Sequence, residues 1–308
     1  MNKSTPIPTF VGPYRLSQVI FETFNSIVFE SYHPERCQKL AIKLIKKQGV
    51  KPQVIHDEYQ IMQEVNCDYI MPLYDQFDLP EYCALVMPLA TGGDLFEYIY
   101  ANGAIEEHAA CQIIHTALLA LRHLNNLGIW HRDIKPENFF FMDDSLTEIN
   151  IKLGDLGFAK HFSDGELSDD WIGTASYCAP EIHKKIKYDK SVDIWSLGVT
   201  MYVILSSESP FPIEEKEMLY AITQGIYDFN SSSWDEISEE AKDLIRRMMN
   251  INPSNRITVD EALQHPWFQV YFPDHNKPRL EREIQGSTRI SSPFDVADEY
   301  DEDLFQIN

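Results

Sequence analysis

Long apolar runs are absent from this chain of 308 residues. No stretch approaches the roughly 18 apolar residues that a transmembrane helix requires. The first nine residues contain two prolines and no apolar core, which does not fit a signal peptide. We therefore expect no contact with a membrane.

Paired cysteines are also absent. The five cysteines are scattered, none forms a C-x-x-C pair, and an odd number does not fit a disulfide framework. This usage predicts free thiols in a reducing compartment, so we expect a cytoplasmic protein.

Positive charge is scarce. The chain has 26 lysines and arginines against 48 aspartates and glutamates, which gives a net charge of −22 at pH 7. Such a charge disfavours binding to nucleic acid and to anionic membranes. It permits cationic partners, such as peptides rich in arginine or lysine, although an acidic surface also serves solubility alone.

The first quarter of the chain reads as a sheet with one helix. Alternating apolar residues predict antiparallel strands over residues 14–21, 27–32 and 40–45. Residues 54–65 have the spacing of an amphipathic helix. Residues 83–87 (CALVM) form a short apolar run that predicts a buried strand, and Pro88 ends it.

The rest of the chain has helical character. An apolar stripe predicts a helix over residues 106–127, and residues 193–205 are apolar nearly all round, as in a helix buried inside a lobe. Ser238 and the capping-box pattern from Thr258 to Glu261 begin two more helices. We therefore expect an α+β fold with a small β-rich lobe, a larger helical lobe and a ligand site between them.

Four short motifs carry the chemistry. They are LAIK at residues 40–43, HRDIKPEN at 131–138, DLG at 155–157 and APE at 179–181. One tripeptide alone is weak evidence, but four motifs in this order and structural context exclude coincidence. The chain resembles the eukaryotic protein kinase family, of the serine/threonine type.

The resemblance covers about residues 14–268 and implies the bilobal protein kinase fold. It divides the chain into an N-terminal extension at 1–13, a β-rich N-lobe at about 14–87, a hinge at 88–90, an α-helical C-lobe at 91–268, and an acidic, disordered tail at 269–308. Residues 273–308 contain nine acids and four bases.

The family's activity implies ATP and Mg²⁺ as cofactors and a protein hydroxyl as the acceptor. By resemblance, Asp133 would orient the hydroxyl and accept its proton, Lys135 would steady the transferring phosphate, and Thr174 would hydrogen-bond beside them. Asn138 and Asp155 offer oxygen ligands that suit Mg²⁺.

Nucleotide binding would use residues from both lobes. Lys43 would hold the α- and β-phosphates and needs an acidic partner, for which Glu58 aligns better than Glu64. The complete set implied by the resemblance is Phe21, Glu22, Thr23, Phe24, Asn25, Ser26, Val28, Ala41, Lys43, Glu58, Met87, Pro88, Ala90, Asp94 and Phe140. Pro88 keeps its carbonyl acceptor although it lacks an N–H, and Asp94 would meet the ribose.

The phosphate-covering loop departs from the family pattern. The pattern G-x-G-x-x-G-x-V falls on residues 21–28 (FETFNSIV), so Phe21, Thr23 and Ser26 replace all three glycines. Glycine allows open dihedral angles and a close backbone approach to phosphate. We therefore predict weak ATP binding, because a glycine-poor loop offers fewer well-placed N–H groups and each strained backbone position would cost on the order of 1–3 kcal/mol.

Other residues look architectural by resemblance. Asp193 would hold the catalytic-loop backbone, and Glu181 with Arg256 would form a buried ion pair. A spine of side chains would cross both lobes through Met62, Leu73, His131 and Leu156.

Several features favour the calcium/calmodulin-dependent group within the family, among them GGDLFEYI at residues 92–99 and HPWF at 265–268. However, no EF-hand loop is present, and the tail lacks a basic amphipathic helix. Control by calmodulin is therefore unsupported.

Two interpretations of function remain open. The first is an active kinase that prefers serine acceptors near basic residues, because Asp94 and Glu137 match positions that receive such residues. The second is a pseudokinase that acts as a scaffold or allosteric partner, which the lost glycines favour. A third interpretation, an acidic interaction protein that works through its tail, is compatible with either of these.

Activation would follow an unusual route. Asp170 occupies the usual phosphorylation position, four residues before Thr174. We expect an Arg132–Asp170 pair to order the activation segment without a phosphate. The alternatives are a solvated acidic loop, or phosphorylation at Ser168.

Overall fold

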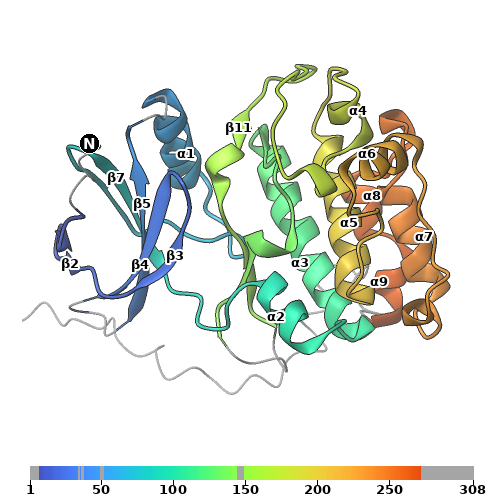
Figure 1. Cartoon of the computed structure of the whole chain (residues 1–308), viewed down its shortest axis with the longest axis horizontal. Coiled ribbons are helices and arrows are strands. Elements are labelled where there is room, and N and C mark those ends of the chain that lie inside the picture. The colour runs from blue at the N-terminus through green and yellow to red at the C-terminus, as the bar shows by residue number, and fades with distance from the viewer. Residues whose placement is uncertain (1–6, 34, 36–37, 49–51, 144–148, 272–308) are drawn as a thin grey trace, which may run out of the picture.

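The computed structural model describes residues 7–33, 35, 38–48, 52–143 and 149–271 (Figure 1). The acidic region 273–308 lies outside the described residues, as do residues 1–6. Residues 269–271, which the sequence analysis assigned to the tail, belong to the last helix, and Tyr271 packs against the core.

The N-terminal part is a five-stranded antiparallel sheet in the order β3-β4-β5-β7-β6. Its strands are β3 (Val19–Glu22), β4 (Ser26–Tyr32), β5 (Lys39–Lys46), β6 (Asp75–Asp78) and β7 (Tyr82–Pro88). β5 lies in the middle and is buried on both faces, as its run of apolar residues requires.

The expected single strand over residues 14–21 is wrong at its start. A separate hairpin forms from β1 (Phe10–Val11) and β2 (Tyr14–Arg15), and the sheet begins only at Val19. The cause is long-range: the Tyr14 hydroxyl bonds to Asp75, and the Ser31 hydroxyl donates to the Arg15 carbonyl at 2.8 Å.

One helix accompanies the sheet. The predicted helix is confirmed as α1 (Pro52–Glu64), and its Ile55, Ile61 and Met62 join the main core with residues of β5 and β7. A smaller core that includes Val11, Leu40 and Val86 covers the rest of the sheet.

The C-terminal part is mostly helical. Its helices are α2 (Leu95–Asn102), α3 (Glu107–Asn126), α4 (Pro180–His183), α5 (Ser191–Ser206), α6 (Glu215–Gln224), α7 (Glu239–Met248), α8 (Val259–Leu263) and α9 (Pro266–Tyr271). Both predicted caps are confirmed: Ser238 accepts the Ala241 amide, and Thr258 with Glu261 forms a capping box.

Short strands and 3₁₀ turns connect the helices of the C-terminal part. Strand β8 (Ile129–Trp130) pairs with β11 (Lys160–His161), and β9 (Phe139–Phe141) pairs with β10 (Ile151–Leu153). The 3₁₀ turns are η1 (Pro136–Asn138), η2 (Leu156–Phe158), η3 (Ala175–Tyr177), η4 (Ser232–Trp234) and η5 (Pro253–Asn255).

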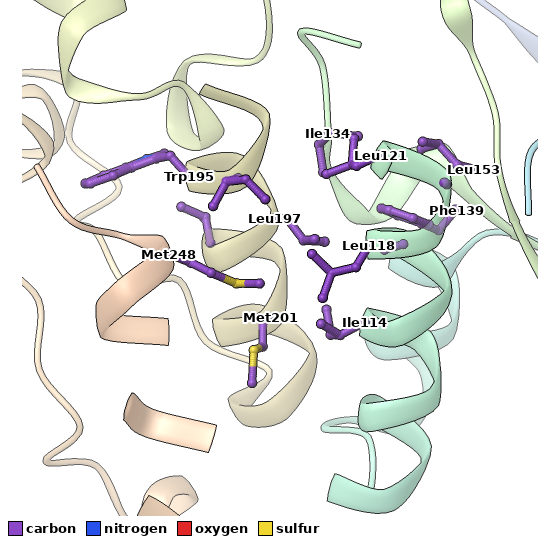
Figure 2. Packing of buried hydrophobic residues seen from close by; sticks show 14 of the residues in the cluster. Ile114, Leu118, Leu121, Ile134, Phe139, Leu153, Trp195, Leu197, Met201 and Met248 are labelled. Carbon is purple, nitrogen blue, oxygen red and sulfur yellow. The ribbon is translucent and has the colours of Figure 1, made fainter. Parts of the chain in front are cut away.

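Helix α5 lies at the centre of the helical part, as its uniformly apolar sequence predicts. Figure 2 shows α5 with Leu197 and Met201 facing Leu118 and Ile114 of α3, and Met248 of α7 on its other side. Gly198 permits this packing, because a Cβ there would lie 2.8 Å from the Met248 side chain. The centre of the helical part, around α5, is therefore closely packed.

Among the described residues, no helix is long and apolar enough to cross a membrane.

Candidate active site

The HRD segment is held in place by one buried carboxylate. Asp193, at the start of α5, accepts the His131 amide at 2.8 Å and the Arg132 amide at 2.7 Å. Arg132 has a φ of 67°, a left-handed conformation that is unfavourable outside glycine and is found mainly at functional sites. Asp193 compensates for this strain, which confirms its predicted contact.

Asp133 is the centre of the polar cluster. Its carboxylate accepts the Thr174 amide at 2.9 Å and the Thr174 hydroxyl at 2.8 Å. Lys135 Nζ lies 3.0 Å from Asp133 Oδ2 and 2.8 Å from Thr174 Oγ1. The structure thus brings together three residues that are spread over 41 positions of the chain.

Asn138 completes this group. Its Nδ2 donates to the Asp133 carbonyl at 2.7 Å and lies 3.2 Å from Oδ2 of the same residue. This geometry uses the amide nitrogen and leaves the oxygen, which is the better ligand for Mg²⁺, without a protein donor in the described chain.

Lys43 links the sheet to the helical part. From β5, its Nζ donates to Glu58 Oε1 and to Asp155 Oδ1, both at 2.8 Å. Glu58, from α1, is buried. The other candidate acid, Glu64, pairs instead with His161 at 3.0 Å, so Glu58 is the partner, as predicted.

The electrostatics keep Lys43 and Asp155 charged. Lys43 and burial act on Asp155 in opposite senses, and Lys43 prevails, lowering the pKa of the carboxyl to about 2. Burial would lower the pKa of Lys43, but Asp155 and Glu58 outweigh it and raise that pKa above its usual value. Asp155 also has a left-handed φ of 51°. A permanent anion is therefore presented beside a permanent cation.

The residues fit a divalent ion shared with a substrate better than a protein cage. In the described part of the chain, no group of three or more His, Cys, Asp or Glu side chains is arranged to hold a metal. Asp155 and Asn138 each have an oxygen that suits Mg²⁺, which commonly takes one or two protein ligands, with phosphates and water supplying the rest.

Comparison with known proteins agrees with this geometry. Residues 17–268 match the family described as Protein kinase domain. The chain belongs to the protein kinase family. It is 34% identical over 247 residues to calcium/calmodulin-dependent protein kinase type 1 of Caenorhabditis elegans, covering 79% of this chain and 70% of that protein. It is 34% identical over 281 residues to human serine/threonine-protein kinase H1, covering 90% of this chain and 66% of that protein.

The segment predicted as the hinge leaves one backbone donor open. Met87 and Pro88 close strand β7, opposite Ala41 and Leu40. The Leu89 amide donates to the Lys39 carbonyl at 3.2 Å. In contrast, the Ala90 amide donates to no acceptor within the described residues, so it is open to a ligand.

Two further residues that were predicted to bind the nucleotide meet next to the hinge. Asp94 forms an isolated antiparallel bridge with Phe140. Its carboxylate caps α2 by accepting the Glu97 amide at 2.8 Å. Burial raises the pKa of this carboxyl. Asp94 therefore has a structural task as well as its expected ribose contact.

The phosphate-covering loop is compact rather than strained. Residues 19–28 are all described, and none has a positive φ, so the expected backbone strain is wrong. Instead, the Thr23 amide donates to the Ser26 carbonyl at 2.8 Å, and the Ser26 amide donates to Thr23 Oγ1 at 3.0 Å. The Thr23 and Ser26 hydroxyls lie 2.8 Å apart.

These bonds between Thr23 and Ser26, which we call the Thr23–Ser26 lock, leave fewer backbone amides of the loop without a partner. Two amides of the turn already have partners, and Lys46 draws the loop inward by donating to the Phe24 carbonyl at 3.1 Å. Phe24 itself is 97% exposed at the tip. In the sheet, Val28 of β4 pairs with Lys43 of β5 on one side and with Phe21 of β3 on the other. Of the remaining residues in the expected set, Glu22 and Asn25 are exposed.

The architectural predictions agree with the structure. Arg256 donates to both oxygens of Glu181 at 2.7 and 3.0 Å in a buried bidentate pair. Met62, His131 and Leu156 are buried, and Leu73 packs partly buried against the core. His131 Nε2 lies 3.0 Å from the Gly154 carbonyl, which joins the HRD and DLG segments.

Sequence reasoning missed the aromatic support of the activation segment. The rings of Trp130 and Phe162 stack at 3.6 Å with an angle of 9°. The Tyr188 hydroxyl donates to the Asp170 carbonyl at 3.0 Å. In the sequence, these three aromatic residues only lie near the HRD, DLG and APE motifs, and this position does not reveal contacts between distant segments.

Proposed function

We propose that the chain is an active serine/threonine protein kinase that transfers the γ-phosphoryl group of ATP to a protein hydroxyl. The observation that supports this is the joint geometry of two groups: Asp133 with Lys135 and Thr174, and Lys43 with Glu58 and Asp155. Phosphoryl transfer depends mainly on positioning and charge neutralisation, and these groups supply both.

Each residue has a definite role in this mechanism. Asp133 accepts the proton of the incoming hydroxyl, and Thr174 fixes the rotamer of that carboxylate. Lys135 places a positive charge beside it, where charge develops on the phosphoryl group during transfer. Lys43 holds the non-transferred phosphates, and Glu58 keeps its ammonium in place.

The metal would be held by Asp155 and Asn138. When bound, Mg²⁺ neutralises phosphate charge and aligns the transferred group. The lowered pKa of Asp155 keeps this ligand anionic across the physiological range.

The acceptor is proposed to lie near basic residues of the substrate. Glu137 Oε2 is buried and has no hydrogen-bond partner in the described chain. Burial raises the pKa of Glu137, and Asp94 and Asp133 add to this effect. A buried carboxylate oxygen without a donor is costly, and an arginine or lysine of a substrate would satisfy it.

The rival function is a pseudokinase with weak nucleotide binding. The observation in its favour is the Thr23–Ser26 lock, which occupies amides that would otherwise face phosphate. The intact Lys43–Asp155 pair argues against it, because a scaffold has no need for a strained aspartate beside a partly buried lysine.

One assay separates the two functions. Transfer of labelled phosphate from ATP to serine peptides with upstream arginine is measured for the wild type, Asp133→Ala and Asp155→Ala. We expect both variants to lose activity, by about 10²–10⁴-fold for Asp133→Ala. The control Asp164→Ala changes an exposed aspartate between the DLG and APE motifs and should retain activity. Wild-type rates in Asp133→Ala would show that the proposed base is wrong, and no transfer by the wild type would favour the pseudokinase.

A further inference from the structure

A run of lysines stands out on the surface of this acidic protein. Lys184, Lys185, Lys187 and Lys190 follow helix α4 within seven residues, and all four are exposed. We name them the lysine patch. In the part of the chain that the structure describes, none of them has a carboxylate within 4.0 Å, whereas Lys39, Lys47 and Lys242 each have one.

Nearby acids of the described chain form no ion pair with the patch. The activation segment runs beside it, because Ser168 and Tyr188 exchange two backbone hydrogen bonds of 2.9 Å. In that segment, Asp170 is paired with Arg132 at 2.8 Å. Glu166 accepts the Ser163 amide at 2.9 Å.

Besides Asp170, four exposed acids belong to the same two segments, namely Asp164, Glu166, Asp169 and Asp189. Because none of them lies within 4.0 Å of a patch lysine in the described structure, the four ammonium groups remain available to the carboxylates of another segment, in a chain whose net charge is −22.

Apolar side chains accompany this charge. Ile186 lies within the lysine run and is 55% exposed. Trp171 follows Asp170, whose carbonyl is bonded to Tyr188, and it is 69% exposed. A surface of lysines with an aliphatic and an aromatic side chain favours an acidic peptide that also has apolar residues.

The chain itself contains such a peptide. Residues 295–303 (DVADEYDED) have six acids and no base, and Phe294, Leu304 and Phe305 flank them. Their negative charge complements the lysines, and their apolar side chains match the exposed Ile186 and Trp171 beside the patch. Among residues 272–308, no other stretch of nine residues has six acids and no base.

The segment is long enough to reach the patch. Residues 272–294 separate it from Tyr271, the last described residue, and 23 residues span at most roughly 75 Å when extended. A compact unit of this size is about 50 Å across. Figure 1 places α9 and α4 towards opposite ends of the helical part, which this length can bridge.

We infer that residues 295–303 bind the lysine patch of the same molecule, beside the activation segment and outside the active site. Tethering gives the segment an effective concentration of the order of millimolar, so several weak ion pairs suffice for occupancy. Because the pairs are exposed, salt must weaken the contact: the screening length is about 10 Å at 0.1 M and about 3 Å at 1 M.

Zero-length cross-linking of the full chain with a carbodiimide tests this contact directly. The reagent joins a carboxylate to a lysine amine only when the two are in contact, and mass spectrometry of the monomeric fraction identifies the pairs. We expect residues 295–303 to link to the lysine patch at least fivefold more often than to Lys216, an exposed lysine on α6. At 0.5 M NaCl this preference should disappear.

Charge variants give the matched control. Lys184, Lys185, Lys187 and Lys190 are all changed to Glu, and Asp298, Glu299, Asp301 and Glu302 are all changed to Lys, separately and together. Each set alone should abolish the preferred links, and the combination should restore them with the chemical roles of the two segments reversed. Links spread evenly over Lys216 and the patch, links found only in a dimeric fraction, or links unchanged at 0.5 M NaCl would each overturn the inference.

Discussion

The Arg132 guanidinium lies 2.8 Å from the Asp170 carboxylate and thereby joins the catalytic loop to the activation segment. The same guanidinium donates through Nε to the Phe158 carbonyl at 2.8 Å. Lys160 Nζ adds a second positive charge 3.8 Å from Asp170. The activation segment is therefore anchored by a carboxylate at the position where a phosphate was to be expected.

The first prediction concerns activation. Asp170→Asn should lower kcat/KM by about tenfold or more, because a hydrogen bond between charged groups contributes about 1.5–3 kcal/mol and the Arg132 side chain is only 5% exposed. Phosphatase-treated wild type should keep its activity. Steady-state kinetics on a serine peptide measure both.

The matched control is Asp169→Asn, an exposed neighbour with no hydrogen bond or ion pair in the described structure. Full activity in Asp170→Asn would contradict a built-in anchor. Loss of activity in the treated wild type would point to a phosphate instead, although Ser168, the nearest candidate, is only 5% exposed.

The second prediction concerns pH. An ordinary glutamate has a pKa of about 4.3. Because the pKa of Glu137 is raised, its carboxyl gains a proton at a higher pH than that. KM for an arginine-containing peptide should therefore rise as pH falls through this raised value. The rise should be absent in Glu137→Gln, whose KM should already be high.

Two controls isolate this effect. A peptide with alanine in place of arginine should show no such pH dependence, and Glu97→Gln, on the exposed side of α2, should behave as wild type. An unchanged pH profile in Glu137→Gln would remove Glu137 from substrate recognition.

The helices and the catalytic pairs could be predicted from sequence, for physical reasons that differ. Helix α5 has no polar face, so only the middle of a lobe accommodates it, and the caps of α7 and α8 are local signals within four residues. Lys43 with Glu58 and Arg132 with Asp170 came from family motifs, since no local rule joins residues that are 15 and 38 positions apart.

Two predictions were wrong, the strand over residues 14–21 and the strain in the phosphate-covering loop. Both depend on side-chain contacts that a local sequence pattern does not contain. Strand periodicity continued through Tyr14, but its hydroxyl bonds to Asp75, 61 residues away, and draws β2 out of the sheet. Likewise, three missing glycines suggested strain, whereas the Thr23 and Ser26 side chains form their own turn without a positive φ.

The third prediction concerns nucleotide affinity. Restoring glycine at positions 21, 23 and 26 removes the Thr23–Ser26 lock and frees the Ser26 amide from Thr23 Oγ1. Affinity for ATP with Mg²⁺ should rise by about tenfold, the value of one hydrogen bond to a charged group. Isothermal calorimetry measures this, and Phe24→Gly, which adds flexibility without breaking the lock, should change affinity much less. Equal affinities of triple variant and wild type would show that the lock does not limit binding.

The last prediction concerns stability. Arg256 and Glu181 form a buried pair in which the arginine side chain is fully shielded from solvent. Arg256 also donates to the Ser191 carbonyl at 3.0 Å and the Asn250 carbonyl at 3.0 Å, so it connects three segments. Arg256→Ala leaves Glu181 buried without its partner and should lower the free energy of unfolding by about 3–5 kcal/mol. Arg247→Ala removes an exposed pair with Asp243 and should cost less than about 1 kcal/mol. Urea unfolding followed by circular dichroism compares the two, and similar losses in both variants would show that burial of the pair does not determine its contribution.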